Sequence, residues 1–192
     1  MLPRWVHSYM DPAFPSFLLP DEIHVRVMQL RDTDEFLAAV HESVDEVGKW
    51  LPWCVPGYSY QMAESWITHC RQSFINHTMY EFGIFQGGVF AGGVGINQLD
   101  PPIRAGNLGY WLRSSKHGNG IMTQVARRVA QWALTDQEFK RVSIVAALEN
   151  AASRRVAEKI GAQFEGVARN GLNLHGEWLG AAQYSLIPSD LE

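Results

Sequence analysis

Residues 107–123 read NLGYWLRSSKHGNGIMT, which is an apolar strand-like run, a turn with two glycines and the start of an amphipathic helix. Gly118 and Gly120 let the backbone turn tightly, and the first N–H groups of a helix have no partner within it. Lys116 and His117 add local positive charge. The pattern fits an anion site at a helix N-terminus, and it fits equally an ordinary turn between a strand and a helix.

Other phosphate, metal and hydrolase motifs fit this sequence poorly. A Walker loop closes with Gly-Lys-Ser or Gly-Lys-Thr, whereas Lys116 precedes the glycines, and a dinucleotide fingerprint needs a glycine where Thr123 stands. His41-Glu42 lacks the second histidine of a zinc protease, because Asp45 stands there. There is no Gly-x-Ser-x-Gly sequence, and no two of the 7 histidines are spaced to bind a metal from one helix face. We therefore expect no metal.

The composition indicates one globular domain. The chain has 192 residues, 46% of them apolar, which suits roughly one domain and excludes disorder and disulfide scaffolds. A formal net charge of −4 offers no broad surface for nucleic acid or anionic lipid, and the apolar run at residues 142–148 is too short to cross a membrane. With only two cysteines and no signal peptide, we expect a cytoplasmic protein without nucleic-acid or membrane partners.

The spacing of apolar residues predicts four helices and about seven strands. Asp32 and Glu35 have the spacing of a helix capping box, and Asn150 is expected to cap the last helix. The order of elements is β-α-α-β-β-β-α-β-α-β-β, which indicates one mixed α/β domain over residues 21–192. Residues 1–20 carry four prolines and are expected to form an extended arm. Strands are predicted at residues 23–27, 80–86, 89–96, 107–112, 142–148, 163–168 and 178–187.

Several short motifs occur in a defined order between about Ile23 and Ile187. They are Trp50-Leu51-Pro52-Trp53, Gly109-Tyr110-Trp111-Leu112, the run from Lys116 to Thr123, Glu149-Asn150-x-x-Ser153, Glu158-Lys159-x-Gly161, Glu165-Gly166 and Tyr184-Ser185-Leu186. Their order and spacing resemble the GNAT superfamily of acyl-CoA-dependent N-acetyltransferases. More narrowly, they resemble its RimJ/RimL-type branch of ribosomal-protein N-terminal acetyltransferases.

The resemblance implies a GNAT-like α/β (α+β) fold, with a mixed, mostly antiparallel sheet of about seven strands that is splayed at its centre. It implies acetyl-CoA as co-substrate, with the pantetheine arm between the strand ending near Leu112 and the strand ending near Leu148. Backbone N–H groups from His117 to Met122 would hold the pyrophosphate, and Asn150 would bond the pantetheine amides. The implied co-substrate residues are Trp111, Leu112, His117, Gly118, Asn119, Gly120, Ile121, Met122, Thr123 and Asn150.

The resemblance also implies that a neutral amine attacks the thioester directly, but this sequence departs from the family at positions that would assist the attack. Ala157 stands where many members carry a tyrosine acid, whereas the serine that serves RimL-like members is kept as Ser153. The glutamate base of those members would fall near Leu172, and an aspartate frequent in the last strand falls at Gly180. The base is therefore unassigned.

His175 and Glu177 are nearby substitutes for the missing base, and Glu81 and Asp100 are weaker ones. Each of the four also fits a solvated loop residue. The candidate catalytic residues are therefore Ser153, His175 and Glu177.

The pKa of the acceptor amine bears on how much help it needs. A peptide α-amine, with a pKa near 7.7 to 8.0, costs about 1 kcal/mol to deprotonate at pH 7, against about 4.6 kcal/mol for a lysine. We therefore expect the N-terminal α-amine of a protein as acceptor, such as a ribosomal protein that starts with Ser or Ala. Two alternatives stay open: a small amine such as an amino sugar, polyamine or antibiotic, and an acyl-CoA-binding module that has lost catalysis.

Aromatic residues mark two further regions. Trp50, Trp53, Tyr58 and Tyr60 could line a peptide site or simply pack their loop onto the sheet. The arm over residues 1–20 is also aromatic, which suits packing on a second copy and a homodimer.

Overall fold

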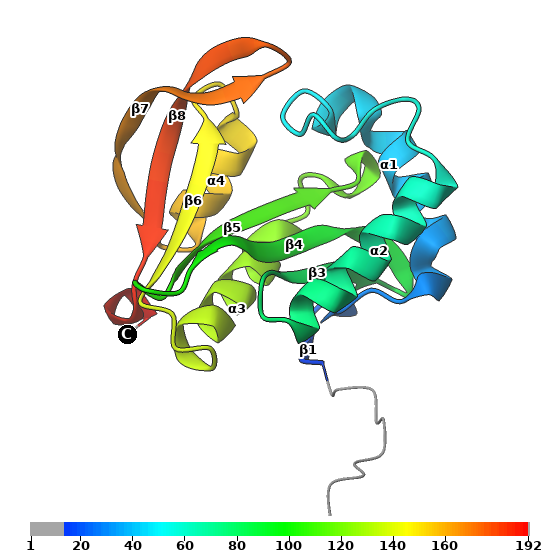
Figure 1. Ribbon diagram of the computed structural model, residues 1–192, viewed down its shortest axis with the longest axis horizontal. Coiled ribbons are helices and arrows are strands. Elements are labelled where there is room, and N and C mark those ends of the chain that lie inside the picture. The colour runs from blue at the N-terminus through cyan, green and yellow to red at the C-terminus, as the bar shows by residue number, and fades with distance from the viewer. Residues whose placement is uncertain (1–13, 192) are drawn as a thin grey trace, which may run out of the picture.

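The computed structural model describes residues 14–191, which form one eight-stranded sheet with four α-helices (Figure 1). The predicted fold class and the predicted elements are confirmed. An additional strand, β1, lies within the predicted arm, and residues 1–13 of that arm lie outside the described residues. The elements are β1 (Ser16–Leu19), β2 (Ile23–Arg26), α1 (Thr33–Val47), α2 (Tyr60–Ile75), β3 (Tyr80–Gln86), β4 (Val89–Asp100), β5 (Ala105–Leu112), α3 (Ile121–Thr135), β6 (Arg141–Ala147), α4 (Ala151–Lys159), β7 (Gln163–Leu174) and β8 (Glu177–Leu186).

The sheet splits at its centre. Its strand order is β1-β2-β3-β4-β5-β6-β8-β7, and β5 and β6 form its parallel pair. These two strands pair only where residues 105–107 face residues 141–143. Beyond that seam β5 continues beside β4 and β6 continues beside β8, so the strands part as Figure 1 shows.

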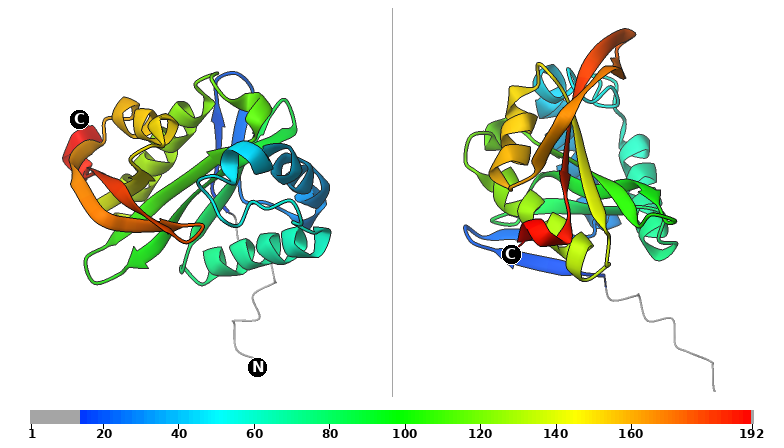
Figure 2. Two further views of the ribbon diagram at one scale, coloured as in Figure 1. Left: turned by 90° about the horizontal axis from the view of Figure 1, so that it is seen from above. Right: turned by 90° about the vertical axis from the view of Figure 1, so that its left-hand side faces the viewer.

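Helices cover both faces of the sheet (Figures 1 and 2). Helices α1 and α2 pack on one face of β3, β4 and β5, where Phe36 and Ile67 are buried against Phe90. Helix α3 lies on the opposite face, and α4 packs against α3 and β6. The predicted apolar face of α3 is buried as expected, and its Trp132 meets Phe82 edge-on with ring centroids 5.4 Å apart.

One predicted helix cap is wrong and another is confirmed. Asp32 makes no side-chain cap to α1, because its two carboxylate oxygens accept hydrogen bonds from Arg26 at 2.7 and 2.8 Å. Glu35 therefore has no capping box to complete. Asn150 caps α4 as predicted, since its Oδ1 accepts from Ser153 N at 3.1 Å.

Residues 14–191 contain neither a membrane-spanning helix nor a cluster of metal ligands. None of the helices there is long and apolar enough to cross a membrane. No group of three or more His, Cys, Asp or Glu side chains in that range could hold a metal ion.

Candidate active site

The turn between β5 and α3 presents backbone N–H groups with no side chain over them. Gly118 and Gly120 have φ angles of 82° and 73°, a conformation that glycine adopts without strain. A Cβ atom on either glycine would meet nothing within 4 Å. Helix α3 begins at Ile121, and no side chain of the described residues caps this end. The first N–H groups of α3 are therefore available to an anion.

Helix α1 holds the start of this turn. Arg113 Nε donates to Glu42 Oε2 at 2.9 Å, and Ser115 N donates to Glu42 Oε1 at 2.8 Å. Ser114 N donates to Ser43 Oγ at 3.2 Å. The hydrogen bond from Arg113 lowers the pKa of Glu42 to about 2, so this carboxylate is ionised near neutral pH.

His117 belongs to the same support. Its Nε2–H donates to Leu112 O at 2.9 Å, and its Nδ1 lies 3.2 Å from Glu46 Oε2. Its backbone N–H donates to Ser114 O at 3.2 Å. His117 thus shapes the turn with its side chain, and the free backbone donors begin at Gly118.

Strand β5 has an open edge beyond the seam. Its residues pair with β4 as far as Leu112, whereas none of the described strands pairs with its other edge after Asn107. The backbone polar groups on that edge are available to the amides of an extended ligand. The side chain of Trp111 is buried in the core under α1 and α2, so Trp111 can reach such a ligand through its backbone.

Two hydroxyl groups meet across the split. Tyr110 Oη, from β5, donates to Ser153 O at 3.0 Å, and Ser153 Oγ, from α4, lies 3.3 Å from Tyr110 Oη. Burial raises the pKa of Tyr110 to about 12, so its phenol is neutral and can donate a proton. Sequence reasoning missed Tyr110, although it lies in a quoted motif, because the pairing with Ser153 spans 43 positions.

The other two predicted catalytic residues lie at the tip of the β7–β8 hairpin. His175 Nε2–H donates to Gly48 O, at the end of α1, at 2.8 Å, and Figure 1 shows the hairpin leaning toward that helix. Because Nε2 holds this proton, only Nδ1 could accept another. Glu177 is exposed and makes no hydrogen bond or ion pair with any described residue. No hydrogen bond within residues 14–191 links either side chain to Ser153.

The other positions that were considered for a catalytic acid or base differ in burial. A Cβ atom on Gly180 would lie 2.7 Å from Leu148 Cδ1, so a side chain there would require Leu148 to shift. Ala157 is fully buried. Glu81 is a partly buried carboxylate on β3, and desolvation raises its pKa to about 8. Asp100 is exposed near the end of β4.

The aromatic residues before α2 serve mainly in packing. Trp53 meets Trp111 and Tyr58 edge-on, with ring centroids 5.4 and 5.9 Å apart. Tyr58 is buried and Trp50 partly buried, whereas Tyr60 is exposed. These contacts favour the packing interpretation for Trp53 and Tyr58.

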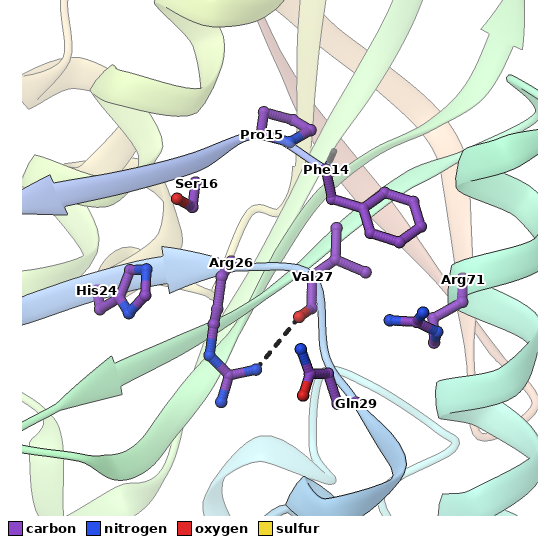
Figure 3. Close-up of a pocket in the computed structure, with 8 residues that line it drawn as sticks. All are labelled: Phe14, Pro15, Ser16, His24, Arg26, Val27, Gln29 and Arg71. Carbon is purple, nitrogen blue, oxygen red and sulfur yellow. Dashed lines mark hydrogen bonds between the residues drawn. The ribbon is translucent and has the colours of Figure 1, made fainter. Parts of the chain in front are cut away.

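A separate pocket lies beside β1 and β2, with a volume of about 270 Å³. Figure 3 shows Arg26 and Arg71 on its walls. Arg26 donates to Val27 O at 3.2 Å and to Asp32, and the Arg71 guanidinium lies 5.0 Å from the centre of the Phe14 ring. Because both cations are already engaged, this pocket offers no ready anion site.

Comparison with known proteins identifies the family. A model described as "Acetyltransferase (GNAT) domain" matches residues 22–163. The chain belongs to the GNAT acetyltransferase family. YdaF of Bacillus subtilis (strain 168), to which a ribosomal N-acetyltransferase activity is ascribed, is 30% identical over 173 residues, covering 90% of this chain and 94% of YdaF. The predicted resemblance is thereby confirmed.

Solved structures agree with this assignment. A crystal structure of a "Probable acetyltransferase" has a TM-score of 0.85 and 28% identity, covering 91% of this chain and 98% of the other. RimL, a ribosomal L7/L12 α-N-protein acetyltransferase solved in complex with coenzyme A, has a TM-score of 0.83 and 21% identity, covering 90% and 98%. The RimL likeness concerns the fold.

This GNAT acetyltransferase therefore uses acetyl-CoA as its co-substrate and transfers the acetyl group to an amine. The residues present fit that ligand. The turn at Gly118 and Gly120 is open where a pyrophosphate would lie, and the unpaired edge of β5 can bond the pantetheine amides.

Proposed function

We propose that this acetyltransferase modifies the N-terminal α-amine of a protein, such as a ribosomal protein. The observation that carries the proposal is the similarity to YdaF, which extends over nearly the whole of both chains. The chemistry supports it, because an α-amine needs far less help to lose its proton than a lysine does.

We assign each part of acetyl-CoA to a different group of residues in the site. Backbone N–H groups of residues 118–123 would bind the pyrophosphate, and the edge of β5 would bind the pantetheine arm. The Tyr110 and Ser153 hydroxyls would lie at the thioester, where they could donate hydrogen bonds to the departing thiolate. Asn150 would hold the start of α4 through its hydrogen bond to Ser153 N.

The test is thiol release from acetyl-CoA with peptides that start with Ser or Ala. The matched control is the same peptides with the α-amine already acetylated, and a parallel series contains polyamines and amino sugars. Release with the free peptides, together with a 42 Da mass gain at the α-amine, is the expected result. Release with the small amines alone would replace the proposed function by small-molecule acetylation.

If no acceptor gives thiol release while acetyl-CoA still raises the melting temperature, the result would contradict transferase activity toward these amines. The protein would then behave as an acyl-CoA-binding module. The Gly120 variant described below provides the matched control for that binding.

A further inference from the structure

Glu81 projects from β3 onto the sheet face that α1 and α2 cover. Its neighbours Tyr80 and Phe82 lie in the opposite core, as alternation along a strand requires. Glu81 pairs with Gly95 of β4, and Gly95 pairs in turn with Gly109 of β5. This row of three residues leads from Glu81 to the strand whose far edge is open.

Glycines of β4 and β5 leave the sheet surface beside Glu81 without side chains. A Cβ atom on Gly95 would overlap Glu81 Oε2, and one on Gly93 would lie 3.1 Å from Glu81 Oε1. The carboxylate therefore lies over β4, where only glycine leaves it room. A Cβ atom on Gly109 would meet one group, Asn97 Nδ2, at 3.2 Å. No side chain of Gly95 or Gly109 therefore separates the carboxylate from β5.

Two polar groups on this face have no partner among the described residues. Within the described part of the chain, Glu81 makes no hydrogen bond or ion pair. Asn107 Oδ1, on the same face of β5, is buried and unpaired among residues 14–191. A partly buried carboxylate without a partner is costly to the fold, and such groups concentrate at functional sites.

Among residues 14–191, no charged group is a cause of the pKa shift of Glu81. Desolvation alone raises its pKa, to about 8. Cys70, on α2, is the titratable group that senses it: burial first, and then the charge of Glu81, raise the pKa of that thiol, which therefore stays protonated. Trp111 presents its neutral indole Nε1 beside Gly93. An arriving ammonium group would be the missing counter-charge.

We propose that Glu81 is the catalytic base of this acetyltransferase, receiving the acceptor ammonium from the side of Gly109 on β5. One N–H bond of the ammonium breaks, and its proton passes to the Glu81 carboxylate. The neutral nitrogen then forms the C–N bond as the thioester C–S bond breaks. The second proton leaves the nitrogen as the coenzyme A thiolate is protonated, and Glu81 returns its own proton to solvent.

This assignment rests on the proposed function for the kind of amine and deepens it. The pKa of a peptide α-amine is about 7.7 to 8.0, so proton transfer to Glu81 is nearly balanced, whereas a lysine at about 10.4 is more than two units uphill. The equilibrium for proton transfer to Glu81 therefore favours α-amines over lysine side chains by about 100-fold.

The experiment compares Glu81→Gln with the unmodified protein across pH 6.5 to 9.5, at saturating acetyl-CoA and with a Ser-starting peptide. We expect kcat at pH 7 to fall by about 10² to 10³. The defect should shrink as pH rises above about 8, because Glu81 is then already ionised and the amine loses its proton unaided, and the Kd for acetyl-CoA should be unchanged. Asp34→Asn, which changes an exposed carboxylate on α1, is the matched control and should follow the unmodified protein.

A defect of equal size at every pH would overturn the proposal, because it would indicate a change of shape rather than of proton transfer. An unchanged kcat at pH 7 would overturn it as well. Glu81→Asp keeps the carboxylate and should retain more activity than Glu81→Gln, which decides the matter if the latter folds poorly. If small amines prove to be the acceptors, the proposed function fails, and the same pH comparison on those amines still decides the role of Glu81.

Discussion

Gly120 combines a positive φ of 73° with open space where a side chain would point. We predict that Gly120→Val abolishes acetyl-CoA binding, with at least a 100-fold rise in Kd, because the branched side chain would fill the space for the pyrophosphate. Isothermal titration calorimetry with acetyl-CoA measures the effect.

Gly161→Val is the control for backbone strain, since Gly161 has a φ of 92° and equally open space beyond the end of α4. It should lower the melting temperature to a similar extent and leave the Kd unchanged. Undiminished affinity in Gly120→Val would exclude the pyrophosphate from this turn.

The Tyr110 and Ser153 hydroxyls are 3.3 Å apart and should act as a unit. Tyr110→Phe and Ser153→Ala should each lower kcat by about tenfold, while the double variant loses much less than the product of the two. Steady-state kinetics of the four proteins give the coupling. Fully multiplicative losses would mean that the hydroxyls act independently.

At the scale of elements, α1 supports the phosphate turn through Glu42. Arg113 lowers the pKa of Glu42 to about 2, below the usual 4.5. The stabilisation that Glu42 gives to the folded state is therefore present above about pH 4.5 and is lost as pH falls toward 2. We predict that Glu42→Gln lowers the free energy of unfolding at pH 7 by about 1 to 2 kcal/mol after allowance for solvent screening. It should also weaken acetyl-CoA binding.

Urea unfolding at pH 7 and pH 3 tests this, and the difference between the two proteins should be smaller at the lower pH. Glu35→Gln removes a more exposed carboxylate 3.9 Å from the same Arg113 and should have little effect. Equal effects of the two substitutions would show that general charge, rather than the specific contact, holds the turn.

The β7–β8 hairpin is tied to α1 by the hydrogen bond from His175 to Gly48 O. We predict that His175→Ala raises the acceptor KM severalfold with little change in the Kd for acetyl-CoA, whereas His175→Asn, which can still donate to the carbonyl, is milder. If His175 were the base, both variants would lose kcat equally. Hydrogen exchange at residues 174–177 reports the release of the hairpin.

Over the whole molecule, Glu81 should shape the dependence of stability on pH. Its folded pKa of about 8 exceeds its unfolded value of about 4.5, so the folded state retains a proton that the unfolded state releases. Stability should therefore fall as pH rises from about 4.5 to 8, by up to about 4 kcal/mol. Urea unfolding should show this slope, and Glu81→Gln should be flatter. Parallel curves would contradict the raised pKa.

Periodicity predicted the elements that bury a regular apolar face, such as α3 and β6. It missed β1, because Pro15 and Pro20 bracket that strand without interrupting it. Asn150 is a local cap and was predicted from its neighbours, whereas Asp32 is taken by Arg26 from another element. Contacts between distant residues decide the rest of the site, and a single sequence carries no spacing that reports them.

The seam between β5 and β6 also bears on solubility. An unpaired strand edge can recruit another chain by β-augmentation, and here two such edges face each other inside one sheet. The tie from His175 to Gly48 joins the two sides above them (Figure 1). A second protein strand would have to bring side chains on both its faces past that tie, whereas the pantetheine arm proposed for this edge is narrower. We therefore expect the tie to hinder pairing with another chain while the proposed co-substrate arm can still enter.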